Sequence, residues 1–173
     1  MEGSIAFNSW DVSNVENMTY MFNGAELFNQ PIGNWNVSNV TTTLGMFFSA
    51  LAFDQPIDGW NVGQVIDMYS MFNSAESFNQ NLNNWDTSSV QIMALTFYGA
   101  TAFNGNITDW ETSQVTEMRW MFGRAESFNQ NIGGWNTSNV IEMSYMFFDA
   151  ANFNQNIGGW NTSEVTTMYA MFQ

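Results

Sequence analysis

"FNQNIGGWNTSNV" occupies residues 128–140, and the chain writes it again 25 residues later as "FNQNIGGWNTSEV" at 153–165. The tryptophan in this phrase marks a period, because one tryptophan follows another every 25 residues without insertion or deletion. A period of this length predicts a solenoid with one coil per repeat. We expect residues 1–173 to form a single repeat solenoid, with coils starting near Trp10, Trp35, Trp60, Trp85, Trp110, Trp135 and Trp160. Because neither end has a distinct polar capping repeat, we also expect a fragment of a longer array.

Apolar residues hold fixed places within the repeat when the tryptophan is counted as position 0. Valine stands at position 5 and phenylalanine at position 12 in all seven repeats. Alanine at position 15 and phenylalanine at position 18 are present in the six repeats that reach them. Methionine fills positions 8 and 11, except at Thr43 and Thr96. These side chains are predicted to fill the core, and the methionines are interpreted as core packing rather than copper or haem ligands.

The same positions predict the local structure of each coil. The run "IGNWNV" at 32–37 places tryptophan and position 2 on one face of a short strand. Residues at three- and four-residue steps then predict one face of a short helix, here Val15, Met18, Phe22 and Ala25. Polar and glycine residues are placed to cap that helix: Ser13, Glu16, Gly24 and Gly99. The expected fold class is an α/β repeat solenoid, leucine-rich-repeat-like, of about seven 25-residue coils, each with a short parallel strand and a short helix or helical turn.

The phrase "FNQ" at the end of each repeat is interpreted as structural. Asparagine holds position 19 in five of six repeats, and glutamine holds position 20 in five of six. Identical amides on successive coils can hydrogen-bond along the stack and satisfy loop backbone groups. We therefore predict an amide ladder here rather than a ligand site.

Charge and composition exclude several classes of function. The chain has 16 acidic residues, two arginines, no lysine and a net charge of −14, so it cannot neutralise phosphates of nucleic acid. Without histidine or cysteine, the usual catalytic triads and thiol nucleophiles are unavailable. We predict no enzyme, no cofactor and no metal site, although Asp54, Asp58 and Asp109 leave loop calcium binding open. No apolar run is long enough to span a membrane, so direct membrane insertion is not expected.

A second period of 50 residues appears at the variable positions. Position 13 is aromatic only in even repeats, and position 16 is glutamate only in odd repeats. Either polar neighbours pair locally with polar neighbours, or an aromatic strip runs along one edge of the rod. Such a strip would suit neutral sugars or another protein. The candidate binding residues are Phe48, Tyr98, Phe148, Tyr20, Tyr69, Trp120, Tyr145 and Tyr169.

The ordered pattern W-N-V-S-N-V-x-x-M-x-x-M-F-x-x-A-x-x-F-N-Q-x-I resembles the BspA-type leucine-rich-repeat surface proteins, which include mycoplasma surface lipoproteins. The resemblance covers residues 5–173. It implies a leucine-rich-repeat-like solenoid for adhesion or recognition, extracellular or on the cell surface, with no catalytic residues. Export would depend on a segment outside this sequence.

The function expected from the sequence is binding of a protein or a neutral glycan on a cell surface. One alternative is a structural protein whose arrays self-associate into dimers or fibres through uncapped ends. Another is ice binding by a ladder of hydroxyls at position 3, although no outward Thr-x-Thr ladder accompanies it. That ladder comprises Ser38, Ser88, Ser113 and Ser138.

Overall fold

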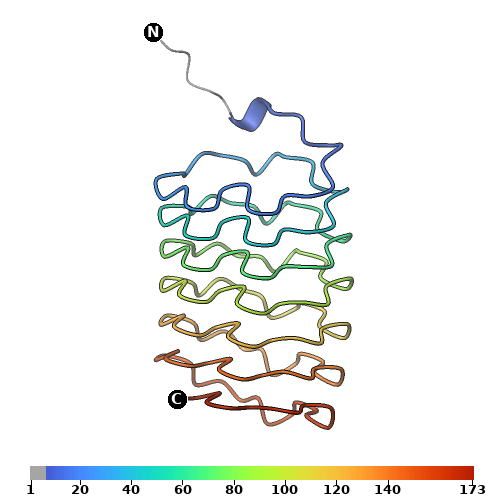
Figure 1. Ribbon diagram of the computed structural model, residues 1–173, viewed down its shortest axis with the longest axis vertical. Coiled ribbons are helices and arrows are strands. Elements are labelled where there is room, and N and C mark those ends of the chain that lie inside the picture. The colour runs from blue at the N-terminus through green and yellow to red at the C-terminus, as the bar shows by residue number, and fades with distance from the viewer. Residues whose placement is uncertain (1–6) are drawn as a thin grey trace.

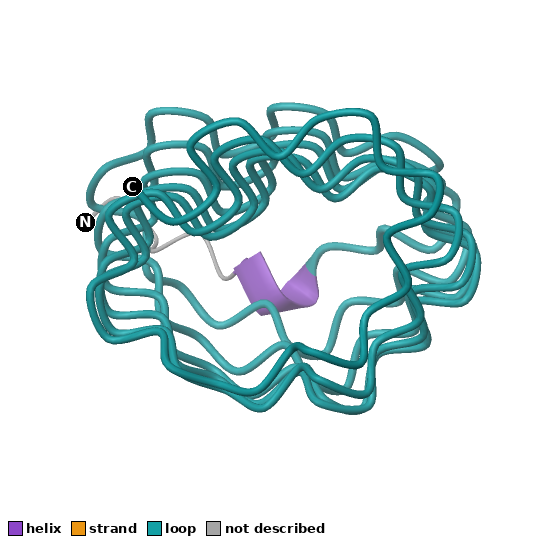
Figure 2. Ribbon diagram, turned by 90° about the horizontal axis from the view of Figure 1, so that it is seen from below, coloured by secondary structure: helices purple, strands orange, loops and turns teal. Residues whose placement is uncertain are grey.

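The computed structural model describes residues 7–173, and there the chain winds into coils stacked along one axis (Figure 1). A single 3-10 turn, η1 at Phe7–Ser9, precedes the first coil. Viewed along the axis, successive coils share one oval outline (Figure 2). Each coil takes one repeat, because parallel bridges join position 7 of neighbouring coils. The bridged residues are Asn17, Thr42, Asp67, Ile92, Glu117, Glu142 and Thr167.

Two sets of backbone hydrogen bonds alternate along one side of every coil. The N–H groups at positions 8, 10, 12 and 14 donate to carbonyls of the next coil, as from Met18 to Thr42 at 3.1 Å. The N–H groups at positions 11, 13, 15 and 18 donate to the carbonyl three residues back, as from Phe28 to Ala25 at 2.9 Å. Positions 10 and 14 have φ between 52° and 70°, as the third residue of a type II turn requires. This side of the coil is therefore a series of β-turns.

The predicted helix and the predicted strand are both wrong for the described residues. Within 7–173, η1 is the only helix, and no strand extends beyond a single bridged residue. The backbone N–H of Trp35 donates to the carbonyl of Ile32 at 3.1 Å, so residues 32–35 form a turn, and residues 35–37 form no strand. The backbone N–H of Ser13 donates to Oδ1 of Asp11, so Ser13 belongs to a turn and caps no helix. Steps of three and four residues place side chains on one face in consecutive turns as well as in a helix, which explains the misassignment.

The interior of the stack consists of ladders of identical side chains. The tryptophan rings of neighbouring coils lie nearly parallel, with centroids 6.1–6.5 Å apart from Trp10 to Trp135. Each indole Nε1 from Trp35 onward donates to a backbone carbonyl 28 residues earlier, as from Trp85 to Ile57 at 2.9 Å. The phenylalanines at positions 12 and 18 of one coil stack at 3.9–4.1 Å. The prediction that the tryptophans, phenylalanines and methionines form the core is confirmed.

The amide ladder predicted at position 19 is also confirmed. Each backbone N–H at this position donates to the side-chain oxygen of the same position one coil earlier, at 2.8–3.0 Å. The glutamine at position 20 donates to the same residue of the earlier coil, as Gln130 does to Asn104. The phrase "FNQ" therefore joins coils to one another: its phenylalanine packs in or against the core, and from the second coil on its position-19 backbone N–H and its glutamine donate to the preceding coil.

Candidate functional site

The turns of positions 8–15 decide which side chains face outward. Positions 8, 11, 12 and 15 are buried through the middle of the stack, whereas positions 9, 10, 13 and 14 are mostly half-buried or exposed. All eight predicted binding residues occupy positions 9, 10 or 13. Tyr20 and Tyr169 are 50% and 67% exposed, and the other six are half-buried. All eight therefore lie on the side of the coil that the β-turns form, with side chains at least partly accessible to solvent.

Five of the eight form one connected group, which we call the aromatic cluster: Tyr98, Trp120, Tyr145, Phe148 and Tyr169. The rings of Trp120 and Tyr145 stack at 4.1 Å with an interplanar angle of 6°. Trp120 also meets Tyr98 at 5.4 Å and Phe148 at 5.2 Å. Tyr145 extends the group to Tyr169 at 5.2 Å. Tyr145 also meets Phe148 at 5.8 Å, so Trp120 and Tyr145 each have three ring neighbours and together form the centre of the cluster.

The other three predicted residues lie apart from the aromatic cluster. Tyr20 covers Gly45 on the next coil, where an added Cβ would collide with the tyrosine ring. Phe48 makes no ring contact within the described residues, and Tyr69 contacts an arginine rather than another ring. The structure thus divides the predicted strip, with a cluster on the later coils and separate rings on the earlier ones.

Gly123 accounts for part of the alternation at position 13. A Cβ added there would lie 2.7 Å from the ring of Trp120 and 3.0 Å from that of Tyr98. A small residue between two aromatic ones therefore makes room for the cluster. This packing is a fit of size between Gly123 and the rings at positions 10 and 13, which builds the aromatic surface, and it does not involve the residue at position 16.

Both arginines of the chain lie over tyrosine rings on this side of the coil, Arg124 at the edge of the aromatic cluster and Arg119 at Tyr69 outside it. The guanidinium of Arg124 lies 5.9 Å from the ring of Tyr98, and its Nε is 3.7 Å from Oδ2 of Asp149. Arg119 lies 5.9 Å from the ring of Tyr69, and its Nε is 3.0 Å from Oε1 of Glu117. Arg119 and Arg124 hold positions 9 and 14, beside the aromatic positions 10 and 13, and these places in the repeat could have predicted their contacts with tyrosine rings.

Glu117 lies beneath this surface in an unusual environment for a carboxylate. Its Oε1 is buried and accepts no well-aligned hydrogen bond, so Arg119 is its partner. Burial raises the pKa of Glu117; Arg119 opposes this shift, and the nearby carboxylates of Glu142 and Asp67 add to it. By contrast, hydrogen bonds from Ser88 hold the pKa of Asp86 below its ordinary value.

Most carboxylates at positions 1 and 7 have a structural role that the sequence did not reveal. At position 1 the side-chain oxygen accepts the N–H two residues later in every coil, as in the bond from Ser88 to Asp86 at 3.1 Å. Position 7 repeats this bond in five coils, as in Tyr69 to Asp67 at 2.8 Å. The carboxylates at position 1 are exposed to solvent, and they stabilise turns at the same time.

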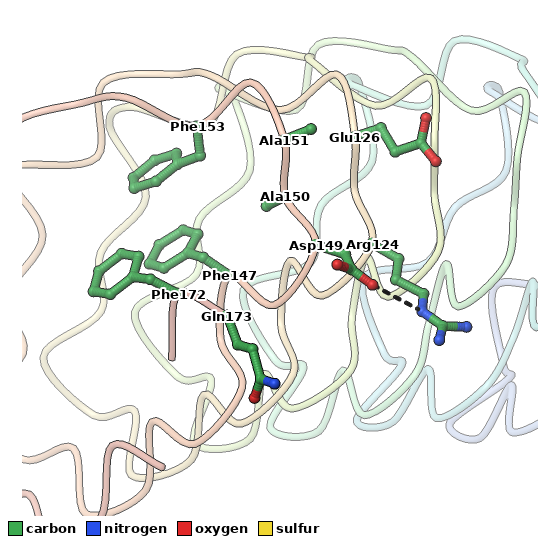
Figure 3. A pocket seen from close by; sticks show the side chains of 9 residues that line it. All are labelled: Arg124, Glu126, Phe147, Asp149, Ala150, Ala151, Phe153, Phe172 and Gln173. Carbon is green, nitrogen blue, oxygen red and sulfur yellow. Dashed lines mark ion pairs between the residues drawn. The ribbon is translucent and has the colours of Figure 1, made fainter. Parts of the chain in front are cut away.

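A hollow of about 750 Å³ lies at the last coils (Figure 3). Phe147, Phe153 and Phe172 line one side of it, and the Arg124–Asp149 ion pair lies on the other. In earlier coils, the following coil packs against these same positions, so we base no site on this hollow. Within residues 7–173, no group of three or more ligating side chains could hold a metal ion, and Asp54 and Asp109 accept hydrogen bonds from amides. None of the described helices is long and apolar enough to cross a membrane.

The exact period and the stacked coils define a tandem-repeat protein. The chain belongs to the family described as "Mycoplasma protein of unknown function, DUF285", whose model matches residues 2–110 and again residues 78–173. No curated protein and no solved structure matches the chain.

Proposed function

We propose that this chain is a non-enzymatic binding module of an extracellular surface protein, with the aromatic cluster as its contact for another protein. The family match to a Mycoplasma repeat family supports a repeat surface protein. The motif order that resembles the BspA-type proteins supports a leucine-rich-repeat-like solenoid within that class. The stacked coils agree with the solenoid part of this proposal, although they contain turns where an α/β repeat would have helices and strands.

The composition of the aromatic cluster carries the proposal. Tryptophan, tyrosine and arginine are the residues most enriched among the hot spots of protein interfaces. Trp120 is the one tryptophan outside the core ladder, and it lies between Tyr145 and Tyr98, whose ring Arg124 contacts. Each arginine is already paired with a carboxylate, so the surface presents rings and paired charges rather than a positive patch. That arrangement favours a protein partner over an anionic one.

The carboxylates that could serve catalysis have other roles in the described residues. Positions 1 and 7 hold turns together, and Glu117 is paired with Arg119. Together with the absence of histidine and cysteine from the sequence, this supports a module that binds without catalysing a reaction.

A pair of substitutions tests this function. Trp120→Ser removes a central ring of the aromatic cluster, and Tyr20→Ser removes an exposed ring at the same position of the first coil. Ser70 has φ +54° at this position, so serine suits the backbone in both variants. The readout is binding to an array of purified cell-surface and extracellular-matrix proteins. We expect Trp120→Ser to weaken binding by tenfold or more, on the order of the 1.4 kcal/mol or more lost at a hot spot, and Tyr20→Ser to leave it unchanged.

Three results would contradict the proposal. Equal binding by both variants would remove the aromatic cluster from the interface. Binding that survives protease treatment of the target but is lost on periodate oxidation would assign the surface to a glycan. A mass that rises with concentration in light scattering, and falls in Trp120→Ser, would identify a second copy of this chain as the occupant.

A further inference from the structure

A second surface, away from the aromatic cluster, is formed by positions 3, 4 and 6 of the third to seventh coils. Two open hollows of about 340 and 480 Å³ lie side by side there and share Gln91 and Gln114. Their volumes are within the range of about 300–1,000 Å³ found for small-ligand sites. We call this surface the glutamine groove. Its remaining lining consists of Gln64, Ile66, Ser88, Ser89, Thr116, Ser138, Asn139, Ile141 and Glu164.

The glutamines of this groove have unused hydrogen-bonding groups. No hydrogen bond within the described residues engages the side-chain amides of Gln64, Gln91 or Gln114, and all three side chains are exposed. Glutamines at position 20 behave differently, since Gln80 and Gln130 donate to the preceding coil. The amides in the groove are therefore available to a ligand as both donors and acceptors.

Position 4 alternates between coils and thereby shapes the groove. In even coils its side chain is short and donates to the preceding coil, as from Ser89 to Gly63 and from Asn139 to Ser113, each at 2.7 Å. In the third and fifth coils it is glutamine, which reaches outward without such a bond. This is the same two-coil period that the aromatic positions show, on another part of the coil.

The groove carries almost no charge in a strongly acidic chain. The segments 63–66, 88–91, 113–116 and 138–141 contain no acidic or basic residue, and Glu164 is the one carboxylate in the lining. Ile66 and Ile141 are 43% and 49% exposed within it. Neutral amides and hydroxyls beside exposed aliphatic groups match a ligand with hydroxyl edges and C–H faces. Phosphate, sulfate and carboxylate groups would find no cation there.

We propose that the glutamine groove binds a neutral oligosaccharide that runs along the stack, with the amides of Gln91 and Gln114 as its central hydrogen-bonding groups. Gln64 and Gln114 hold position 4 two coils apart, which is about 9.6 Å at a coil spacing of about 4.8 Å, so every second sugar ring would meet a glutamine at this position. The site is separate from the aromatic cluster, since it uses positions 3, 4 and 6 rather than 9, 10 and 13.

The test begins with the intact chain on an array of immobilised neutral oligosaccharides, printed beside sialylated and sulfated ones. The neutral oligosaccharide that gives the strongest signal is then titrated by calorimetry into the wild type and into Gln91→Ala, Gln114→Ala and Gln30→Ala. Gln30 is an exposed glutamine at position 20, outside the groove, and serves as the matched control. We expect Gln91→Ala and Gln114→Ala each to weaken binding about fivefold, as the loss of a neutral hydrogen bond does, and Gln30→Ala to bind as the wild type.

The outcomes separate the two proposed sites. Absence of binding to any neutral oligosaccharide, binding only to the acidic ones, or unchanged affinity in both groove variants would overturn this inference. Loss of sugar binding in Trp120→Ser with retention in Gln91→Ala would assign the sugar to the aromatic cluster instead. Equal melting temperatures for the three glutamine variants, expected for exposed side chains, exclude unfolding as the cause of any loss.

Discussion

Replacing Trp85 by phenylalanine tests why tryptophan occupies position 0 of every repeat. The side chain is 3% exposed, and its ring lies 6.4 Å from that of Trp60 and 6.1 Å from that of Trp110. Its Nε1 donates to the backbone carbonyl of Ile57 at 2.9 Å. Phenylalanine retains an aromatic ring in the ladder but cannot donate this bond.

The expected cost comes from two sources. The carbonyl of Ile57 also accepts the backbone N–H of Trp60 at 3.1 Å, so it keeps one donor and the loss of the indole bond costs about 0.5–1.5 kcal/mol. The smaller ring adds about 1 kcal/mol for lost contacts and residual space. We therefore expect Trp85→Phe to lower the free energy of unfolding by roughly 1.5–2.5 kcal/mol. Trp85→Ala, which also removes the ring, should cost about 3–5 kcal/mol or more.

Urea unfolding followed by far-UV circular dichroism measures these differences. Trp10→Phe is the matched control, because Trp10 belongs to the same ladder but is 44% exposed, and its Nε1 makes no hydrogen bond within the described residues. We expect the control to change the free energy of unfolding by less than about 1 kcal/mol. If Trp85→Phe costs no more than Trp10→Phe, the indole hydrogen bond is not the reason for the repeated tryptophan.

Three further predictions concern the turns, the amide ladder and the buried carboxylate. Gly24 and Ser49 both have positive φ, which glycine adopts more easily than other residues. Gly24→Ala should therefore destabilise the chain by about 1 kcal/mol, since the added Cβ meets no other atom, and Ser49→Gly should stabilise it by a similar amount. Thermal unfolding of both variants measures the change in stability. Asn104→Ala removes an oxygen that accepts two hydrogen bonds from the next coil, so it should lower the free energy of unfolding by about 1–2 kcal/mol. An unchanged midpoint of urea unfolding would show that the amide ladder contributes nothing to stability. The pKa of Glu117 is raised in the folded state, so its charged form destabilises the fold at neutral pH. This destabilisation disappears as the pH falls to the ordinary carboxyl range and Glu117 is protonated. The wild type should therefore gain stability relative to Glu117→Gln on acidification. The comparison of wild type with Asp86→Asn should show the opposite trend, because the lowered pKa of Asp86 gives a stabilisation that is present above the ordinary pKa of 3.8 and is lost below it. Urea unfolding at pH 7 and at about pH 2.5 distinguishes the two slopes.

Side chains that face the interior could be predicted from the sequence because each meets its own equivalent on the next coil. Phe47 stacks on Phe72 at 5.5 Å, and Asn79 accepts the backbone N–H of Asn104 at 2.8 Å. A strict 25-residue period brings such residues together whatever conformation the chain adopts between them. Core membership and the amide ladder therefore followed from counting alone.

The aromatic surface could be predicted only as a set of outward positions. Trp120 and Tyr145 stack because they hold position 10 of adjacent coils. Tyr20 holds the same position but is separated from them by three coils without an aromatic residue there, and it lies over Gly45 instead. Which rings meet depends on the residues of the intervening coils, so the candidate list included residues that the structure keeps apart.

The sequence by itself determined the period, the ladders and the absence of histidine, cysteine and lysine chemistry, because each of these depends on residue identity and spacing alone. Only the tertiary structure decided that positions 8–15 form turns rather than a helix. The N–H groups of Met18 and Phe22 donate to carbonyls 24 residues further along the chain, on the next coil, and a helix would have used those donors internally. The choice between the two conformations was made by hydrogen bonds between coils, which no local stretch of sequence contains.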